Sequence, residues 1–386
     1  MKNRILVFAH DASLYGAAQS LLTLLEELSR NQLVEFFVIL PHKGKMEEAL
    51  KLHGITYKVL DVPRCFTWNH SKNVFQKINH IIRYKSKVRK MMPHLVKITN
   101  EFQPDLVYSN TSIISIGSVL AKKMHLPHVW HVREFGDLDY NFEYLPGRKQ
   151  VIKHMRNSSH VIFVSKSLQQ HWYGDDTGNS SVVYNGLVSA GCSERKYPHH
   201  PFRFGILGAI VPGKGQAVAV KALSMLAKKY PGITLNLFGN VVDKEYQKEI
   251  EESVRVSGCS GSIIFKAFEE DQDLIYSNLD VLLNCSVMEG FGRTIVEAMN
   301  RGIPVIANAS GGPLEIIEHN QTGLLYRHSE ESLAVCMANL LEDESLYERI
   351  SQKGAKDSMN YSVKTYTDKV FAILKNAFPV HSTNKI

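Results

Sequence analysis

Short apolar runs alternate along the chain with longer segments in which apolar residues recur every three or four positions. In the first half, runs rich in Val, Ile and Phe predict strands at residues 4–9, 36–40, 56–60, 106–109, 128–132 and 161–164. Helical spacing between these runs predicts helices at residues 20–29, 46–53 and 114–123. Strands that are apolar on both faces and joined by helices indicate a parallel sheet covered on both sides.

The same alternation starts again after a polar stretch at residues 189–201. It predicts helices at 216–229, 245–256 and 294–300, and strands at 204–207, 234–238, 262–266, 281–284 and 304–307. Two such series predict an α/β protein with two Rossmann-like, doubly wound domains, residues 1–188 and 202–363, joined by a linker at 189–201. We expect residues 364–386 to form a C-terminal helix and tail that packs back on the first domain.

The strand-to-helix loops are the expected place for chemistry, because ligands of parallel sheets bind beyond the carboxyl ends of the strands. We therefore expect the two domains to face each other across a cleft. Composition narrows the class of protein, since 44% hydrophobic and 22% charged residues exclude a disordered or fibrous protein. A formal net charge of +7 suits an anionic substrate or membrane surface and is too small to indicate nucleic acid.

Cysteine usage and the N-terminus bear on location. The five cysteines are dispersed and form no C-x-x-C pair, which predicts reduced thiols rather than a disulfide framework. The first apolar run stops at His10, too early for a signal peptide, so it is interpreted as a buried strand. We expect a cytoplasmic protein that lies free in solution or peripherally on the inner face of the plasma membrane.

The segment at residues 286–299 carries the densest chemistry. Gly290 and Gly292 come just before a predicted helix, where backbone N–H groups can approach an anion and the helix dipole adds about 0.3–1 kcal/mol. Glu289 precedes this helix and Glu297 lies about one turn inside it. The two carboxylates could accept hydrogen bonds from separate hydroxyls of one ligand; alternatively, both are solvated surface groups.

This segment resembles the E-x7-E signature of retaining glycosyltransferases of family 4, which have the GT-B fold. Residues 280–283 before it and 302–307, 311–313 and 322–325 after it are similar to the same family. The resemblance implies a nucleotide-diphosphate sugar held mainly by the C-terminal domain. It assigns Glu289 to the donor sugar as a catalytic residue and Glu297 to the ribose hydroxyls. The donor-binding loop between them is Gly290, Phe291, Gly292 and Arg293.

The loop at residues 208–215 spells G-x-x-x-x-G-K, which is nearly a Walker A motif. Gly215 stands where that motif needs Ser or Thr for Mg²⁺, so an ATPase is not favoured. The loop also resembles the family's diphosphate loop, in which Lys214 matches the catalytic lysine and Gly215 contributes to donor binding. Ala209 stands where the family has an arginine. We hypothesise that Arg293 supplies the missing charge; its alternative is an ordinary surface ion pair.

Two positions of the first domain also match the family. The loop after the first strand resembles the family's glycine-rich loop, but Tyr15 replaces one glycine, so only Gly16 is carried over as donor-binding. Small residues there could equally serve helix–strand packing. His131 lies at the carboxyl end of a predicted strand, where the family places a histidine near the donor sugar, so the resemblance assigns it a catalytic role; a packing role is its alternative.

No metal site is predicted. His125, His128 and His131 have a metal-like spacing, but residues three apart on a strand point to opposite faces. Two Asp-x-Asp triplets, at 137–139 and 271–273, resemble the motif of metal-dependent GT-A enzymes. Neither directly follows an apolar strand, so both are interpreted as exposed loops or helix starts.

Residues 62–100 form a basic segment without a single acidic residue. Apolar residues run through it with helical spacing. It contains nine Lys or Arg residues: Arg64, Lys72, Lys77, Arg83, Lys85, Lys87, Arg89, Lys90 and Lys97. A basic amphipathic segment suits an anionic membrane leaflet or a lipid-diphosphate acceptor. The alternative is a covering helix with a solvated basic face.

Together these observations predict a retaining glycosyltransferase that needs no metal or other cofactor. Its partners would be a nucleotide-sugar donor and a saccharide or lipid-linked saccharide acceptor of surface polysaccharide synthesis. A GT-B nucleotide-sugar 2-epimerase and a catalytically weak nucleotide-sugar-binding protein remain as alternatives. An NAD-dependent enzyme is not favoured, because no G-x-G-x-x-G follows the first strand.

Overall fold

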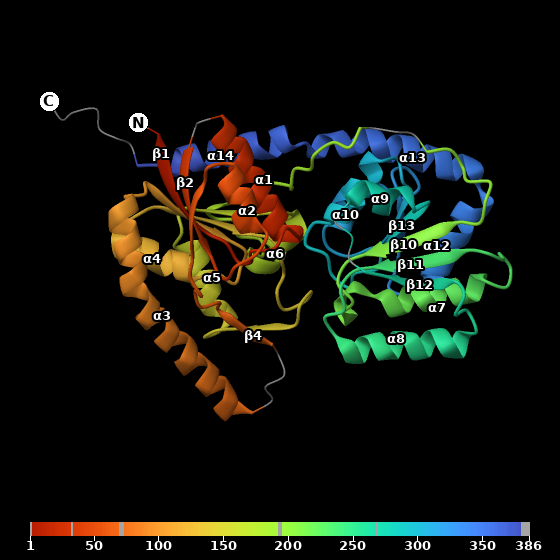
Figure 1. The fold of residues 1–386 in the computed structure, drawn as a ribbon, viewed down its shortest axis with the longest axis horizontal. Helices are drawn as coiled ribbons and strands as arrows, with labels where there is room; N and C mark the ends of the chain where they lie inside the picture. Colours follow the sequence, from red (N-terminus) through yellow and green to blue (C-terminus); the bar gives the residue numbers. More distant parts are fainter. Residues whose placement is uncertain are drawn as a thin grey trace. The chain divides into compact units, whose positions relative to one another are not determined.

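The structure, a computed structural model, describes residues 2–31, 34–68, 73–191, 195–267, 269 and 271–379. The chain forms two units (Figure 1). The first comprises Met1–Gly186 with Val363–Ile386, and the second comprises Leu187–Ser362. Lys72 of the basic segment and Cys192 lie outside the described residues.

The first unit is built on a seven-stranded parallel sheet in the order β3-β2-β1-β5-β6-β8-β9. Its strands are β1 (Asn3–Phe8), β2 (Val34–Leu40), β3 (Thr56–Val59), β5 (Leu106–Asn110), β6 (His128–Val132), β8 (His160–Phe163) and β9 (Ser180–Val182). The six predicted strands are confirmed to within two residues at either end. β9 was not predicted. Strand order reverses between β1 and β5, which makes the loops after these two strands the switch point of the sheet.

Seven helices belong to the described part of the first unit. They are α1 (Gly16–Arg30), α2 (Met46–Leu52), α3 (Val74–Phe102), α4 (Ile116–Met124), α5 (Arg148–Arg156), α6 (Lys166–Tyr173) and α14 (Val363–Ala377). α1 buries leucines at helical spacing, among them Leu21, Leu25 and Leu28. α14 adds Tyr366, Val370 and Leu374 to the same core cluster, so the last described helix completes the first unit. A short antiparallel pair, β4 (Phe66–Trp68) and β7 (Phe142–Tyr144), lies outside the main sheet.

The second unit contains a six-stranded parallel sheet in the order β12-β11-β10-β13-β14-β15. Its strands are β10 (Arg203–Leu207), β11 (Thr234–Phe238), β12 (Ile263–Lys266), β13 (Val281–Asn284), β14 (Val305–Asn308) and β15 (Leu324–Tyr326). The predicted strands are again confirmed, and β15 is an additional edge strand. Chain order reverses between β10 and β13, so the switch point of this sheet lies beyond those two strands.

The helices of the second unit are α7 (Gln216–Leu226), α8 (Lys244–Ser257), α9 (Gln272–Ser277), α10 (Arg293–Asn300), α11 (Pro313–Ile316), α12 (Glu330–Glu342) and α13 (Glu344–Ser358). Two 3₁₀ turns, Pro212–Lys214 and Met359–Tyr361, complete it. The described part of the predicted linker packs on this unit, since Arg195 donates hydrogen bonds to the carbonyls of Tyr276 and Leu279. Within the described ranges, no helix has both the length and the apolar character needed to cross a bilayer.

Candidate active site

Two loops of the second unit meet at the switch point of its sheet. The loop after β10 ends in the 3₁₀ turn of Lys214, and Gly215 follows in the left-handed region at φ 68°. A Cβ on Gly215 would lie 2.1 Å from the carbonyl oxygen of Cys285, just beyond β13. Glycine is therefore required here for the two loops to pack closely, and this packing brings Lys214 to the loop after β13.

Lys214 and Glu289 form an ion pair at this junction. Lys214 Nζ lies 2.9 Å from Glu289 Oε2, and Ser286 Oγ donates to the same oxygen at 3.0 Å. The two charged side chains keep 27% and 19% of their surface exposed, so a ligand can reach them. Burial raises the pKa of Glu289, but the charge of Lys214 and hydrogen bonds from Lys214, Ser286 and Asn284 outweigh it and hold the pKa below its usual value. Glu289 is therefore ionised at neutral pH.

The glycine-rich loop connects this pair to α10. The backbone N–H of Gly312 donates to the Glu289 carbonyl at 2.8 Å, and Gly292 begins α10 with φ 105°. Phe291 is buried, and its ring packs against Tyr361 at 5.7 Å between centroids. The positive end of the α10 dipole thus follows directly after Glu289 in the chain.

Glu297 lies in α10 and is 92% buried, with both carboxylate oxygens bonded. Tyr276 donates its hydroxyl to Oε2 at 2.9 Å, and Arg293 donates to Oε1 at 3.0 Å across one helical turn. Burial and the neighbouring Glu297 charge raise the pKa of Tyr276 well above its usual value, so Tyr276 remains a donor. Each carboxylate oxygen has two lone pairs, which leaves Glu297 able to accept further hydrogen bonds.

His131 is the penultimate residue of β6 in the first unit and is fully buried. Its Nδ1 accepts from the Tyr108 hydroxyl at 2.5 Å and from Arg133 at 3.3 Å. Burial and the Arg133 charge lower the pKa of His131 well below its usual value, so the ring is neutral. Because Nδ1 accepts, the proton is on Nε2, which is buried without a protein partner in the described residues. A buried N–H of this kind is available to a ligand.

Comparison with known proteins assigns both units of the chain to glycosyltransferase families. Residues 15–188 match the family described as Glycosyltransferase Family 4, and residues 194–357 match Glycosyl transferases group 1, so the two matches together cover most of the chain. The fold is similar to that of Anabaena Alr3699/HepE, crystallised with UDP and glucose, with a TM-score of 0.78, 23% identity, and coverage of 97% of this chain and 100% of that one. The chain belongs to the GT4-like GT-B glycosyltransferases.

Two curated relatives match shorter stretches of this GT4-like chain. The poly(glycerol-phosphate) alpha-glucosyltransferase of Bacillus subtilis is 25% identical over 174 residues, 44% of this chain and 25% of that protein. The mannosylfructose-phosphate synthase of Agrobacterium fabrum is 29% identical over 157 residues, 39% of this chain and 35% of that protein. The matched stretches therefore span about a quarter and a third of the length of these two relatives.

The structure places the predicted site residues of this GT4-like chain in both units. Lys214, Gly215, Glu289, Glu297 and the intervening loop lie together in the second unit. His131 and Gly16 belong to the first unit. Gly16 begins α1 with φ 46°, a conformation that favours glycine, and Tyr15 before it is 43% exposed. The functional roles of all these residues remain predictions.

Arg293 forms an ion pair with Glu297, as the alternative interpretation of Arg293 expects, although this pair is largely buried and not at the surface. The carbonyl of Ala209 accepts from Gln216 at 2.9 Å. A role for Arg293 as the substitute for the family's arginine stays a hypothesis, because its guanidinium is held by a carboxylate in this structure.

Sequence reasoning missed the groups that orient the predicted residues. Tyr276 bonds Glu297 and Ser286 bonds Glu289, while Tyr108 and Arg133 bond His131. Ser286 could have been found, because it opens the same motif as Glu289. Arg133 follows His131 by only two residues, but nothing local shows that its side chain turns back to the ring. Tyr276 and Tyr108 lie on separate elements from the residues that they bond, and no local pattern connects them.

Several residues of the rejected metal motifs have other partners. Both ring nitrogens of His128 are bonded, to Ser109 and Ser158. Asp139 accepts from the backbone of residues 135 and 136, and Asp271 caps α9, which confirms a helix start for the second triplet. In the part of the chain that the structure describes, no cluster of three or more His, Cys, Asp or Glu side chains is arranged to hold a metal ion.

Proposed function

We propose that this chain transfers a sugar from a nucleotide-diphosphate sugar to an acceptor hydroxyl with retention of anomeric configuration. The observation that carries the proposal is the Lys214–Glu289 pair at the switch point of the second sheet, beside the start of α10. The names of its relatives support the donor class: Alr3699/HepE was crystallised with UDP and with UDP-glucose, and the Bacillus protein is named an alpha-glucosyltransferase.

In this proposal Lys214 stabilises the negative charge that develops on the diphosphate as the glycosidic bond breaks. The ionised Glu289 accepts hydrogen bonds from the donor sugar, and Glu297 accepts them from the ribose. The acceptor hydroxyl oxygen bonds to the anomeric carbon on the face from which the diphosphate leaves, and its proton passes to the departing diphosphate oxygen, so the configuration is retained. Lys214, Arg293 and the α10 dipole supply the positive charge, so no step is assigned to a metal ion or other cofactor.

We place this reaction at the cytoplasmic face of the plasma membrane, with a lipid-linked saccharide of surface polysaccharide synthesis as the acceptor. Support comes from α3, whose first half exposes four apolar side chains beside its basic residues: Val74 at 66%, Phe75 at 80%, Ile78 at 48% and Ile82 at 58% exposure. An apolar face flanked by Lys and Arg binds an anionic leaflet by partial insertion and charge attraction.

The alternatives of an epimerase and of a weak binding protein gain no support from the two curated relatives, which are named as a transferase and a synthase. A thermal-shift screen against UDP, GDP, ADP and their sugars tests the proposal directly, since binding to the native state stabilises it. We expect one nucleotide to raise the melting temperature, and Lys214→Ala to remove that shift. Lys221→Ala, which breaks an exposed ion pair with Glu330 on α12, is the matched control and should keep it.

No stabilisation by any nucleotide in the wild-type chain would contradict the proposal. A positive screen then identifies the donor for transfer assays, in which the anomeric configuration of the product tests retention.

A further inference from the structure

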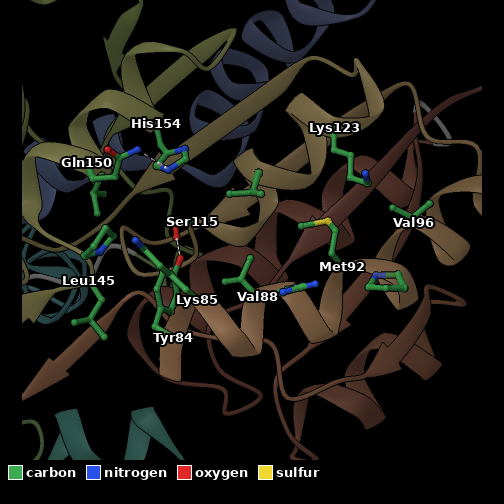
Figure 2. A pocket seen from close by; sticks show the side chains of 15 residues that line it. Tyr84, Lys85, Val88, Met92, Val96, Ser115, Lys123, Leu145, Gln150 and His154 are labelled. Carbon is green, nitrogen blue, oxygen red and sulfur yellow. Dashed lines mark hydrogen bonds between the residues drawn. The ribbon is translucent and has the colours of Figure 1, made fainter. Parts of the chain in front are cut away.

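A groove of about 880 Å³ lies in the first unit between α3, α4 and α5 (Figure 2). Val88, Met92 and Val96 of α3 face Val119 of α4 across it. Figure 2 shows Gln150 and His154 at one end of the groove and Lys123 and Val96 at the other. Its lining is therefore apolar along its length and polar at the ends.

The rim of the groove is positively charged. Lys85 and Arg89 stand one turn apart on α3, and Lys123 lies on α4. None of the lining residues is acidic. Within the described residues, no carboxylate lies within ion-pair distance of these three cations. The nearby Lys122 and Lys153 lower the pKa of His154 after burial, which reflects the same positive field. An apolar channel with unpaired cations at its rim complements a molecule that has a hydrocarbon chain and an anionic group.

One end of the groove lies at the carboxyl edge of the first sheet. α3 ends just before β5 begins, so it runs antiparallel to that strand. Ser115 stands at the start of α4, beyond the carboxyl end of β5, and its hydroxyl bonds the Tyr84 hydroxyl at 2.6 Å. This bond marks the point where α3 passes the carboxyl edge, and Lys85 is the next residue.

The other half of α3 extends beyond that edge. The helix has 29 residues, about 43 Å at 1.5 Å per residue, and its buried residues are confined to its last two turns, 95–102. Residues 74, 78 and 82 are separated by four positions, and 85, 89, 92 and 96 continue the same helical face in steps of three and four. The exposed apolar face of the first turns therefore lies on the same side of α3 as the groove and leads into it.

We propose that this groove binds the hydrocarbon chain of a membrane lipid phosphate, with Lys85 and Arg89 holding its phosphate at the carboxyl edge of the first sheet. The chain packs against Val88, Met92, Val96 and Val119, and the exposed turns of α3 lie in the leaflet from which the lipid enters. This inference rests on the proposed function, because it assigns the acceptor of that reaction to the class of lipid-linked phosphates.

The test is calorimetric binding of farnesyl diphosphate to the full chain without any nucleotide sugar. Farnesol and inorganic diphosphate are the two partial probes, one with the chain alone and the other with the charge alone. We expect farnesyl diphosphate to bind at least about tenfold more tightly than either, because only this probe uses both the apolar lining and the charge-assisted contacts.

Paired variants locate the site. Lys85→Gln/Arg89→Gln should weaken farnesyl diphosphate binding about tenfold. The control Lys87→Gln/Lys90→Gln removes the same charge from exposed residues of α3 outside the groove and should leave affinity within about twofold. Val119→Trp fills the groove from α4 and should also weaken farnesyl diphosphate binding about tenfold. If the Val119→Trp chain does not fold, Val88→Trp repeats the test from α3.

Three results would overturn the inference: equal binding of farnesol, equal binding of inorganic diphosphate, or equal weakening by the control pair. Titrating UDP, GDP and ADP into the same samples separates this failure from failure of the proposed function. If a nucleotide binds and farnesyl diphosphate does not, the transferase proposal is retained and only the proposed lipid site in the groove is rejected.

Discussion

At the switch point of the second sheet, each cation faces a carboxylate: Lys214 lies 2.9 Å from Glu289, and Arg293 lies 3.0 Å from Glu297. In the first unit, the buried Arg133 donates instead to the neutral side chains of Asn110, Asn185 and Tyr366. The charges at this edge of the second sheet are thus paired with one another, while the Arg133 charge of the first unit is held by neutral side chains. Two sheets of the same topology class therefore offer different chemistry at the same edge.

The largest expected effect is on turnover in the second unit. Lys214→Ala and Glu289→Ala should each lower kcat by about 10²–10³, the loss seen when one preorganised stabilising group is removed from a transition state. Steady-state transfer assays with the identified donor measure this, with Lys221→Ala as the control. Wild-type turnover in both variants would show that the paired charges have no catalytic role.

The next effect is on the stability of the first unit. Arg133→Met keeps an apolar stem but leaves two buried amide oxygens and the Tyr366 hydroxyl without their donor, which should cost roughly 2–3 kcal/mol. All three tryptophans of the chain, Trp68, Trp130 and Trp172, lie in this unit, so their fluorescence reports its urea unfolding selectively. Arg30→Met breaks an exposed pair with Glu27 in the same unit and should change its stability by less than about 0.5 kcal/mol. Equal effects of the two substitutions would show that the buried contacts of Arg133 add no more stability than an exposed pair.

Acidification should also affect the first unit selectively. Burial lowers the pKa of His10 to about 4, of His128 to about 3, and of His131 well below its usual value. Below pH 6.5 the unfolded chain binds protons at these three positions that the folded chain does not, so stability falls as the pH drops. Burial raises the pKa of Glu134 to about 7, which opposes this trend because folded Glu134 binds a proton earlier.

These three histidines less Glu134 give a difference of about two protons, which corresponds to roughly 2.7 kcal/mol per pH unit between pH 6 and 5. Burial also lowers the pKa of His154 and of His160, which acts in the same direction. Tryptophan-monitored urea midpoints at pH 7, 6 and 5 measure this pH dependence. His131→Asn removes one of these titrating groups, so the free energy of unfolding should fall less steeply as the pH drops, by the equivalent of about one bound proton. A midpoint that is unchanged between pH 7 and 5 would contradict the assignment of these histidines as neutral.

The smallest effect is expected at the exposed apolar face of α3. Ile78→Ser should lower binding to vesicles that contain anionic phosphatidylglycerol by several-fold, yet change stability by less than about 0.5 kcal/mol. Val256→Ser alters a comparably exposed side chain on α8 of the second unit and should leave vesicle binding unchanged. Vesicle co-sedimentation compares the two, and equal losses would mean that α3 has no special role.

The parts of this molecule that sequence could predict are those with a local signal. Strands β1, β5 and β13 are apolar on both faces, and their runs stand out directly. β9 and β15 have three residues each, too few to show a period, and were missed. The basic segment showed helical spacing, but nothing local indicated that only its last two turns would be buried.

The same limit applies to the candidate site. Glu289 and Glu297 were visible because one loop and one helical turn connect them. Arg133 meets Tyr366 from 233 positions away, and such a pairing has no signature until the fold brings the elements together. The groove beside α3 likewise depends on three helices whose facing residues look ordinary in isolation.

The place of α14 has a consequence for biosynthesis. Val363–Ala377 completes the core of a unit whose other residues end at Gly186, so the whole of Leu187–Ser362 is translated in between. While the ribosome synthesises that insertion, Leu25 and its neighbours on α1 are not yet covered by α14, and Arg133 lacks its partner Tyr366. The first unit to emerge is therefore the last to mature, and a chain that stops at residue 362 should leave it open to proteases.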